Sequence, residues 1–338
     1  MYQALYRKYR PQTFEEVAGQ EVITRTLKNA ITNNKISHAY LFTGPRGTGK
    51  TTIAKILAKI INCENPNELT PCNNCVSCTQ INSKQSTDIV EIDAASNNGV
   101  DEIREIRNKV NLVPSVSKYK VYIIDEVHML TVGAFNALLK TLEEPPEYAI
   151  IILITSNKEA LLDTIKSRCE IIKFLPISLV DLNNYLISQG IDENRAQLLS
   201  TFARGSIEKA IELSESAEFA IMRDEIQTYI EIMLDKDMID ILEIPASMEK
   251  YKKDAISILD MLINYFRDMM LLKENVDKSM IINIDKITFL QNMSKKITYS
   301  QVSKIIDIIE DIKKKIRSNC NFNISIQVMA LNIYEVIK

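Results

Sequence analysis

The stretch Gly44-Pro45-Arg46-Gly47-Thr48-Gly49-Lys50-Thr51 decides the fold, because it satisfies the phosphate-loop pattern G-x-x-x-x-G-K-[ST]. It follows the apolar run of residues 39–43 and precedes a segment in which apolar residues recur at steps of three and four. A strand, a glycine-rich turn and a helix in this order are the context in which the pattern binds phosphate. The sequence therefore predicts a nucleotide-binding fold.

Each residue type of this stretch has a chemical reason to be there. Glycines let backbone N–H groups curl around a phosphate, and the N-terminus of the helix adds positive potential. Lys50 is predicted to reach the β- and γ-phosphates, and the Thr51 hydroxyl to ligate Mg²⁺. We therefore expect ATP and Mg²⁺ to be bound by residues 44–51 together with Thr52.

The chain alternates strand and helix patterns up to Pro176 and is helical beyond it. Parallel doubly wound α/β folds give this alternation. The predicted strands are residues 39–43, 88–92, 120–125, 149–154 and 170–174. We expect an α/β domain over residues 1–176, a small helical lid over residues 177–217 and a larger helical domain over residues 218–338.

Two acids end the apolar run of residues 121–124 and are expected to lie at the carboxyl edge of the sheet, where ligands bind in such folds. Asp125 is predicted to hold Mg²⁺ through its water shell. Glu126 is predicted to orient and deprotonate the attacking water. These acids and the phosphate loop together indicate ATP hydrolysis.

Polar residues follow the next strand, where a side chain can meet the γ-phosphate or the lytic water. These residues are Thr155, Ser156 and Asn157, and a plain turn is the competing interpretation. Arg168 precedes the last strand. From the residues alone it is either an arginine that points toward the nucleotide of a neighbouring subunit or a surface arginine.

Four cysteines follow the phosphate-loop helix with the spacing C-x8-C-x2-C-x2-C, and they are Cys63, Cys72, Cys75 and Cys78. Four thiolates in this arrangement suit tetrahedral Zn²⁺ and leave no open coordination position, which predicts a structural zinc module over residues 63–78. An iron–sulfur cluster is the alternative, because three close cysteines and one distant cysteine also hold iron.

The 338 residues carry a formal net charge of −3, so no global attraction to nucleic acid is expected. The first 60 residues nevertheless hold ten Lys or Arg against three acidic residues. This local surplus fits a DNA-facing surface or the needs of a nucleotide site.

No apolar run is long enough to span a bilayer, and bunched cysteines suit a reducing compartment. We expect a cytoplasmic protein without membrane contact.

The chain resembles the bacterial DNA polymerase III gamma/tau family, the AAA+ ATPases of the sliding-clamp loader. The likeness is dense from residue 2 to residue 176. Besides the phosphate loop and the cysteines, it rests on Tyr6-Arg7-Lys8-Tyr9-Arg10-Pro11, Phe14, Gly19-Gln20, residues 93–100, Asp125-Glu126-Val127-His128-Met129-Leu130, residues 136–146 and Ser167-Arg168-Cys169.

The resemblance implies a motor subunit within DNA polymerase III holoenzyme, a DNA-directed DNA polymerase complex. Its partners would be the delta and delta-prime subunits, further gamma/tau copies, the sliding clamp and primer-template DNA, in a pentamer whose collar is the last helical domain. It places Tyr9, Arg10 and Pro11 near the adenine, Ser156 and Asn157 at the γ-phosphate, and Arg168 as an arginine finger acting in trans. The sequence departs from the tau form in length, because the extension that binds polymerase and helicase is not in it; this fits either a natural short form or a shortened sequence.

One lid motif departs from the family. The family carries Gly-Ser-x-Arg-Asp-Ala, whereas residues 205–210 read Gly-Ser-Ile-Glu-Lys-Ala, so a carboxylate stands at position 208. Lys209 and Arg204 are the two candidates to replace the missing arginine. The departure favours an alternative function, a delta-prime-like stator of the same loader. A AAA+ DNA helicase or branch-migration motor is a further alternative, although it leaves the cysteines unexplained.

Overall fold

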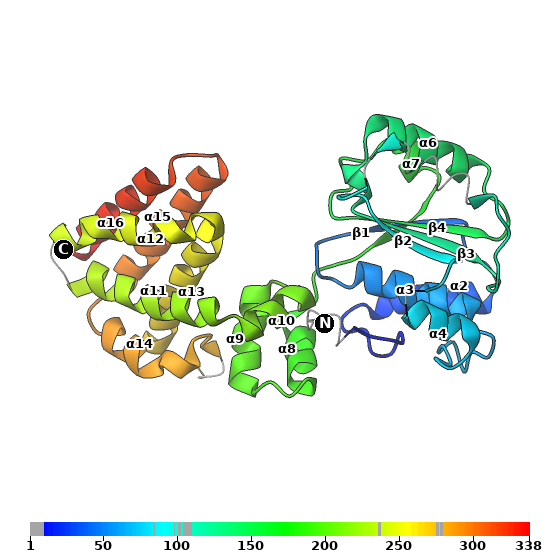
Figure 1. Ribbon diagram of the computed structural model, residues 1–338. Helices are drawn as coiled ribbons and strands as arrows, with labels where there is room; N and C mark the ends of the chain where they lie inside the picture. The colour runs from blue at the N-terminus through cyan, green and yellow to red at the C-terminus, as the bar shows by residue number, and fades with distance from the viewer. Residues whose placement is uncertain are drawn as a thin grey trace. The chain divides into compact units, whose positions relative to one another are not determined.

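The computed structural model describes residues 10–83, 85–97, 99–100, 103, 110–235, 238–274, 277 and 280–338 (Figure 1). Its contacts divide the chain into two compact units. The first unit contains the residues up to Tyr185 together with Arg204–Ile211, and the second contains Leu186–Ala203 and Glu212–Lys338. The predicted division into domains 1–176, 177–217 and 218–338 stays a prediction.

A five-stranded sheet organises the first unit, and every pairing in it is parallel. The strand order is β2-β3-β4-β1-β5, which places β1 and β3 on either side of β4. The strands are β1 (Ala39–Thr43), β2 (Ile89–Asp93), β3 (Lys120–Asp125), β4 (Ala149–Thr155) and β5 (Glu170–Lys173). The predicted parallel α/β fold is therefore confirmed, with strand ends shifted by at most one residue.

Helices cover both faces of this sheet because its inner strands are apolar on both sides. Alternate residues of β1, such as Leu41 and Phe42, enter two different cores. The α3 side also packs α2, while the opposite core packs α6 and α7 (Figure 1). These helices are α2 (Glu21–Thr32), α3 (Lys50–Asn62), α4 (Val76–Asn82), the 3₁₀ turn η1 (Val127–Met129), α6 (Val132–Glu143) and α7 (Asp163–Lys166).

The described residues beyond β5 form helices and no strand, as the sequence predicts. Two helices contribute to both units, α8 (Leu179–Ser188) and α10 (Ile207–Glu215). The others are α9 (Glu193–Ala203), α11 (Ala217–Asp235), α12 (Met238–Met248), η2 (Glu249–Asp254), α13 (Ala255–Lys273), η4 (Ile284–Lys286), α14 (Ile287–Ser294), α15 (Tyr299–Arg317) and α16 (Phe322–Ile337). None of the described helices is both long enough and apolar enough to cross a membrane.

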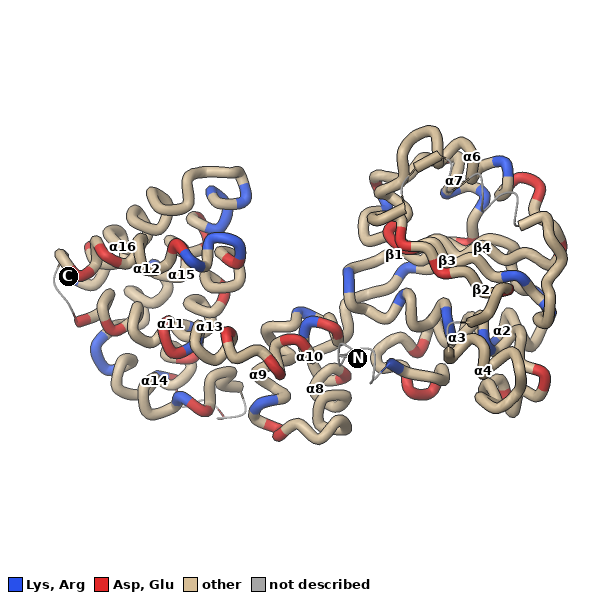
Figure 2. The backbone as a smooth tube through the Cα atoms, in the orientation of Figure 1, with Lys and Arg blue, Asp and Glu red and all other residues tan. Residues whose placement is uncertain are grey.

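Acidic and basic residues lie close together on α15 (Figure 2). Lys315 pairs with Asp311 at 2.8 Å on the helix surface. Lys313 is instead buried, and its ammonium lies 2.6 Å from Asp260 of α13 and 2.6 Å from Glu310. A buried lysine needs such partners because an isolated buried charge is costly. Because these lysines pair with acids, α15 carries charges of both signs and is not a uniformly basic surface.

Candidate nucleotide site and cysteine cluster

The phosphate loop joins β1 to α3 at the carboxyl edge of the sheet. Its last glycine, Gly49, is the residue that precedes α3 and has a φ of 92°, a conformation that side chains disfavour. The free N–H groups of the first turn of α3 therefore point into the loop. Together with the helix dipole, they make this end of α3 a favourable place for an anion.

Lys50 is the first residue of α3, and its side chain is folded into the loop. Its Nζ donates hydrogen bonds to the carbonyl oxygens of Gly44 at 2.9 Å and Pro45 at 2.6 Å. Burial lowers the pKa of Lys50, although the negative charges of Glu126 and Asp125 oppose that shift. The ammonium can exchange its carbonyl partners for phosphate oxygens, because all of these acceptors satisfy the same donor.

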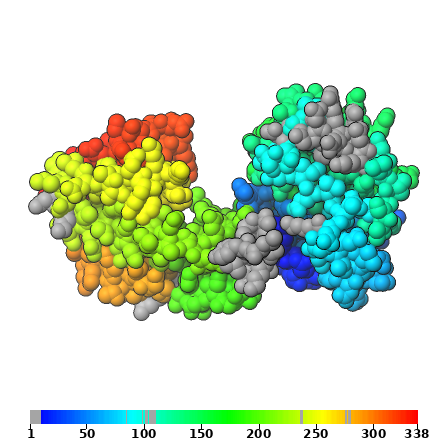
Figure 3. All heavy atoms as spheres, in the orientation of Figure 1, coloured from blue at the N-terminus to red at the C-terminus, as the bar shows by residue number. Residues whose placement is uncertain are grey.

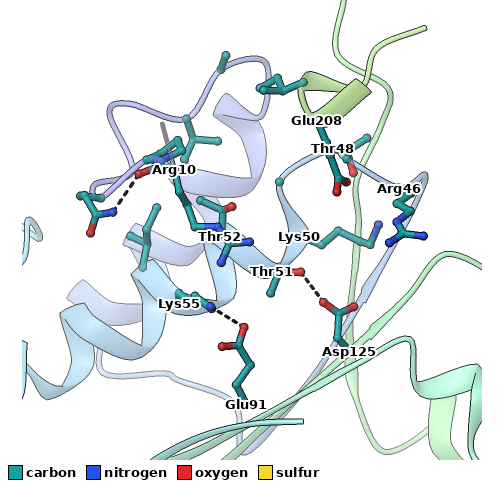
Figure 4. Close-up of a pocket in the computed structure, with 18 of the residues that line it drawn as sticks. Arg10, Arg46, Thr48, Lys50, Thr51, Thr52, Lys55, Glu91, Asp125 and Glu208 are labelled. Carbon is teal, nitrogen blue, oxygen red and sulfur yellow. Dashed lines mark hydrogen bonds and ion pairs between the residues drawn. The ribbon is translucent and has the colours of Figure 1, made fainter. Parts of the chain in front are cut away.

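Thr51 and Asp125 meet across the site although they lie on different elements. The Thr51 hydroxyl donates to Asp125 Oδ2 at 2.7 Å (Figure 4). Asp125 is the last residue of β3, and its Oδ1 accepts the backbone N–H of Glu126 at 2.9 Å. A hydroxyl and a carboxylate held side by side are oxygen ligands of the type that Mg²⁺ prefers.

Glu126 follows β3 in a left-handed conformation, with a φ of 47°. Its Oε2 accepts from the Ser156 hydroxyl at 3.0 Å and from the Ser156 backbone N–H at 3.3 Å. His128 Nδ1 lies 3.4 Å from the same oxygen and 3.0 Å from the Thr155 hydroxyl. Ser156, directly after β4, therefore holds the Glu126 carboxylate in place. A plain turn does not require such a contact.

These groups surround one cavity of about 750 Å³ within the first unit (Figure 4). The predicted residues that line it are Arg10, Pro11, Arg46, Gly47, Thr48, Gly49, Lys50, Thr51, Thr52, Asp125 and Glu126. Tyr9 lies outside the described residues. Ser156 joins the site through Glu126 rather than by lining the cavity. Asn157 touches Thr155, whose hydroxyl accepts the Asn157 N–H at 3.0 Å.

Several lining residues were not anticipated from the sequence. Lys55 lies one turn after Thr51 on α3 and pairs with Glu91 of β2 at 2.5 Å (Figure 4). The spacing Lys50, Thr51, Lys55 on one helix face is a signal that was available in the sequence. Tyr185 of α8 also lines the cavity. Nothing in its local pattern indicated this, because the contact joins distant parts of the chain.

Arg168 lies away from this cavity and is bound within its own unit. Its guanidinium donates to Glu143 at 2.7 Å and to the carbonyl oxygen of Thr164 at 2.8 Å. The arginine side chain is about a third exposed, so it is accessible from outside the chain. Its predicted role in trans stays a prediction.

The four cysteines come together in the first unit, where Cys78 is buried and the other three are half-buried; Figure 3 draws the segment of residues 63–78 in light blue. Their Sγ atoms all lie within 4.8 Å of one another. Cys63 directly follows α3, and Cys75 precedes α4. The chain turns between Cys72 and Cys75 through Asn73, whose φ of 59° is a conformation that asparagine tolerates.

Backbone N–H groups support the sulfur atoms, as they do in metal-binding turns. The N–H of Cys72 donates to Cys63 Sγ at 3.3 Å, and those of Cys75 and Cys78 donate to Cys72 and Cys75 Sγ at 3.3 and 3.4 Å. The N–H groups of Asn74 and Cys75 lower the pKa of Cys72 to about 6, whereas burial raises the pKa values of Cys63 and Cys78. The cluster of four thiols without a disulfide fits a tetrahedral thiolate site.

Comparisons with known proteins agree with this geometry. A family model described as "DNA polymerase III, delta subunit" matches residues 19–178, and one described as "DNA polymerase III, delta subunit, C terminal" matches residues 217–333. The chain is 37% identical to the DNA polymerase III subunit gamma of Buchnera aphidicola subsp. Schizaphis graminum, over 96% of this chain and 90% of that protein. The chain belongs to the DNA polymerase III gamma/tau family.

Other gamma/tau relatives are longer than this chain. The DNA polymerase III subunit tau of Bacillus subtilis is 42% identical over 98% of this chain and 63% of its own length. The tau subunit of Escherichia coli is 46% identical over 64% of this chain and 34% of its own. This chain therefore spans under two thirds of the tau subunits it matches.

Among solved structures, the RuvB Holliday junction branch migration motor of Thermotoga maritima aligns with 85% of this gamma/tau chain and 90% of its own. The identity is 16% and the TM-score is 0.46. A likeness at this level carries no functional inference.

Proposed function

We propose that this chain is an ATP-hydrolysing motor subunit of the bacterial replicative clamp loader, which places the sliding clamp on primed DNA. The observation that carries the proposal is the joining of Lys50, the Thr51–Asp125 pair and Glu126 around one cavity. Family membership supports it, because the matched relatives are DNA polymerase III gamma and tau subunits.

In this proposal the chain's own residues do three things to bound ATP. The phosphate loop and Lys50 bind and orient the phosphates, as buried donors beside a helix N-terminus do. Glu126, oriented by Ser156, takes a proton from the attacking water at a carboxylate oxygen. Arg10 and Pro11, which line the cavity, would contact the adenine.

Mg²⁺ and Zn²⁺ are the proposed cations, in separate places. Thr51 and Asp125 would hold Mg²⁺, which when bound neutralises phosphate charge. The four clustered thiols would hold Zn²⁺ as a structural ion, since they leave no coordination position open for chemistry. The N–H donors to sulfur described above are the structural features that favour a metal-thiolate site.

The remaining assignments rest on the relatives. We propose that this chain assembles in the cytoplasm into a hetero-oligomer of five subunits with delta, delta-prime and further gamma/tau copies, and that the loader acts on the sliding clamp and primer-template DNA. In such an assembly of five subunits, Arg168 would leave Glu143 and contact the nucleotide of its neighbour. An arginine supplied in trans accelerates related hydrolases by orders of magnitude.

Two observations favour a second candidate, a delta-prime-like stator of the same loader. Glu208 lines the cavity, and a stator with a weakened nucleotide site can tolerate a carboxylate there. The family models that match are described as delta-subunit models. The stator would assemble with the loader but would not need to hydrolyse ATP.

Reconstitution separates these functions. The full chain would be mixed with the other loader subunits and the sliding clamp, and clamp transfer onto primed DNA would be scored with wild type and with Lys50→Ala in every copy. A motor requires the chain and loses transfer by ~100-fold or more with Lys50→Ala, because the lysine contacts the reacting phosphates. A stator requires the chain but retains transfer with Lys50→Ala. Transfer that is unaffected when the chain is omitted would contradict both.

A further inference from the structure

The start of α10 is fastened to the phosphate loop. The backbone N–H of Ile207 donates to the carbonyl oxygen of Gly47 at 3.1 Å. A methyl group built on Gly47 would lie 2.0 Å from Ser206 Oγ and 3.2 Å from Glu208 Cβ. Position 47 therefore has no space for a side chain, and the first turn of α10 sits directly against the loop. All of these residues belong to the first unit.

This contact brings a third carboxylate into the cavity. Ile207, Glu208 and Ile211 of α10 line it, which is the face expected for positions i, i+1 and i+4. Figure 4 shows Glu208 reaching toward the side of the cavity where Lys50 and Arg46 lie. Lys209 lies about 100° further round the helix and is not among the described residues that line the cavity.

Glu208 also acts electrostatically on the phosphate-binding lysine. Its negative charge acts on the Lys50 ammonium, as do the charges of Glu126 and Asp125. Within the described part of the chain, no hydrogen bond or ion pair engages the Glu208 side chain. Asp125 and Glu126 have proposed roles in holding a cation and a water, whereas Glu208 lines the same cavity from α10 with neither proposed role.

We propose that Glu208 is a specificity-determining residue that weakens the binding of nucleoside triphosphate relative to diphosphate. The inference rests on the proposed nucleotide site. A triphosphate carries at least one more negative charge than a diphosphate, and that charge lies at the Lys50 end of the site. A carboxylate roughly 8 Å from one extra charge, at an effective dielectric constant of about 20 to 40, changes a dissociation constant by about 5- to 30-fold.

A purely structural role predicts a different result. Glu208 lies in the first turn of α10, where a carboxylate favours the helix dipole. Such a role changes the stability of the lid segment and shifts the affinities of both nucleotides together. Only the electrostatic role changes the ratio of the two affinities and makes that change depend on salt.

The test compares binding of a non-hydrolysable ATP analogue and of ADP, each with Mg²⁺, to the full chain by calorimetry. Glu208→Gln removes the charge and keeps the shape. Glu212→Gln is the matched control, because it makes the same change on α10 at an exposed position outside the cavity. Lys50→Ala reports whether the nucleotide occupies the proposed site at all.

We expect Glu208→Gln to tighten analogue binding about 5- to 30-fold at 50 mM salt, to tighten ADP binding about threefold or less, and to lose most of this difference at 500 mM salt. Glu212→Gln should change neither. Wild-type binding that is sensitive to Lys50→Ala would uphold the nucleotide site. In that case, equal changes for both nucleotides in Glu208→Gln, or no change for either, would overturn the inference. Wild-type binding of neither nucleotide would overturn the proposed function itself.

Discussion

A pair of glycine substitutions separates backbone strain from steric conflict in the phosphate loop. Gly44 has a φ of 145° and Gly49 has a φ of 92°, so alanine is strained at both positions. The surroundings differ. A methyl group on Gly44 would lie 2.3 Å from the carbonyl oxygen of Phe174, whereas one on Gly49 would meet nothing within 4 Å. Both variants therefore carry the cost of backbone strain, but only Gly44→Ala also carries the cost of a steric clash.

The shared cost is the strain of a side chain at positive φ, about 1–2 kcal/mol. At Gly44 the clash is with backbone, so the chain at Phe174, directly after β5, must move by about 1 Å to restore contact distance. That movement loosens the hydrogen bond from the Phe174 N–H to the Thr43 carbonyl oxygen, which is 2.7 Å long and contributes ~1 kcal/mol. It also disturbs the packing of buried Phe174 on Phe42, where overpacking costs ~1–3 kcal/mol.

We therefore expect Gly44→Ala to lower the free energy of unfolding of the first unit by ~3–6 kcal/mol, and Gly49→Ala by ~1–2 kcal/mol. The chain has no tryptophan, so urea unfolding would be followed by circular dichroism at 222 nm. Each variant would be measured without nucleotide, so that altered binding does not enter. Equal destabilisation by the two variants, within about 0.5 kcal/mol, would refute the steric reasoning.

Three other contacts of the chain can be tested by single changes. Ser156→Ala removes the hydroxyl that donates to Glu126 at 3.0 Å, so we expect ATP hydrolysis to fall about 10- to 100-fold at nearly unchanged nucleotide affinity, because a hydrogen bond to a charged group contributes ~1.5–3 kcal/mol. Phosphate release and calorimetry check this, and a matching loss of affinity would contradict it. Asp88→Asn should lower the free energy of unfolding by ~2–3 kcal/mol at pH 7, because the Asp88 carboxylate accepts three backbone N–H groups. Although burial opposes it, these donors lower the pKa of Asp88 below 3.8, so the stability difference is complete above about pH 5 and disappears as the pH falls through the lowered pKa. Urea unfolding at pH 7 and pH 3 tests this, and a difference that persists unchanged at pH 3 would contradict it. Removal of metal by a strong chelator should lower the melting temperature by roughly 6–12 °C, corresponding to ~3 kcal/mol in a domain of this size. Elemental analysis would accompany the melt, and a metal-free protein whose four clustered thiols react freely while folded would contradict a metal site.

The sheet was predictable because its strands are short apolar runs bounded by polar residues. Residues 120–124 and 149–155 are buried on both faces, and that burial leaves a clear signal in the sequence. The carboxyl edge of the sheet followed from parallel topology alone. For this reason Asp125 and Thr51 could be expected to meet, although they are far apart in the chain.

The rest depends on contacts between distant segments. The pairing of Glu126 with Ser156 requires a left-handed residue at 126, which no local pattern of side chains indicates. Glu208 was visible in the sequence as an unexpected acid, but its position against Gly47 depends on how the first turn of α10 packs. The burial of Lys313 among carboxylates was likewise hidden, because a run of three lysines favours a solvated helix face.

Glu126→Gln in the assembled loader tests most directly the proposal that this cavity hydrolyses ATP. Nucleotide affinity and phosphate release would be measured on the same preparation. We predict binding within about threefold of wild type and hydrolysis reduced by about 100-fold or more, because the amide keeps the shape of the carboxylate but cannot accept the proton of the attacking water. Hydrolysis at the wild-type rate in Glu126→Gln would contradict the account.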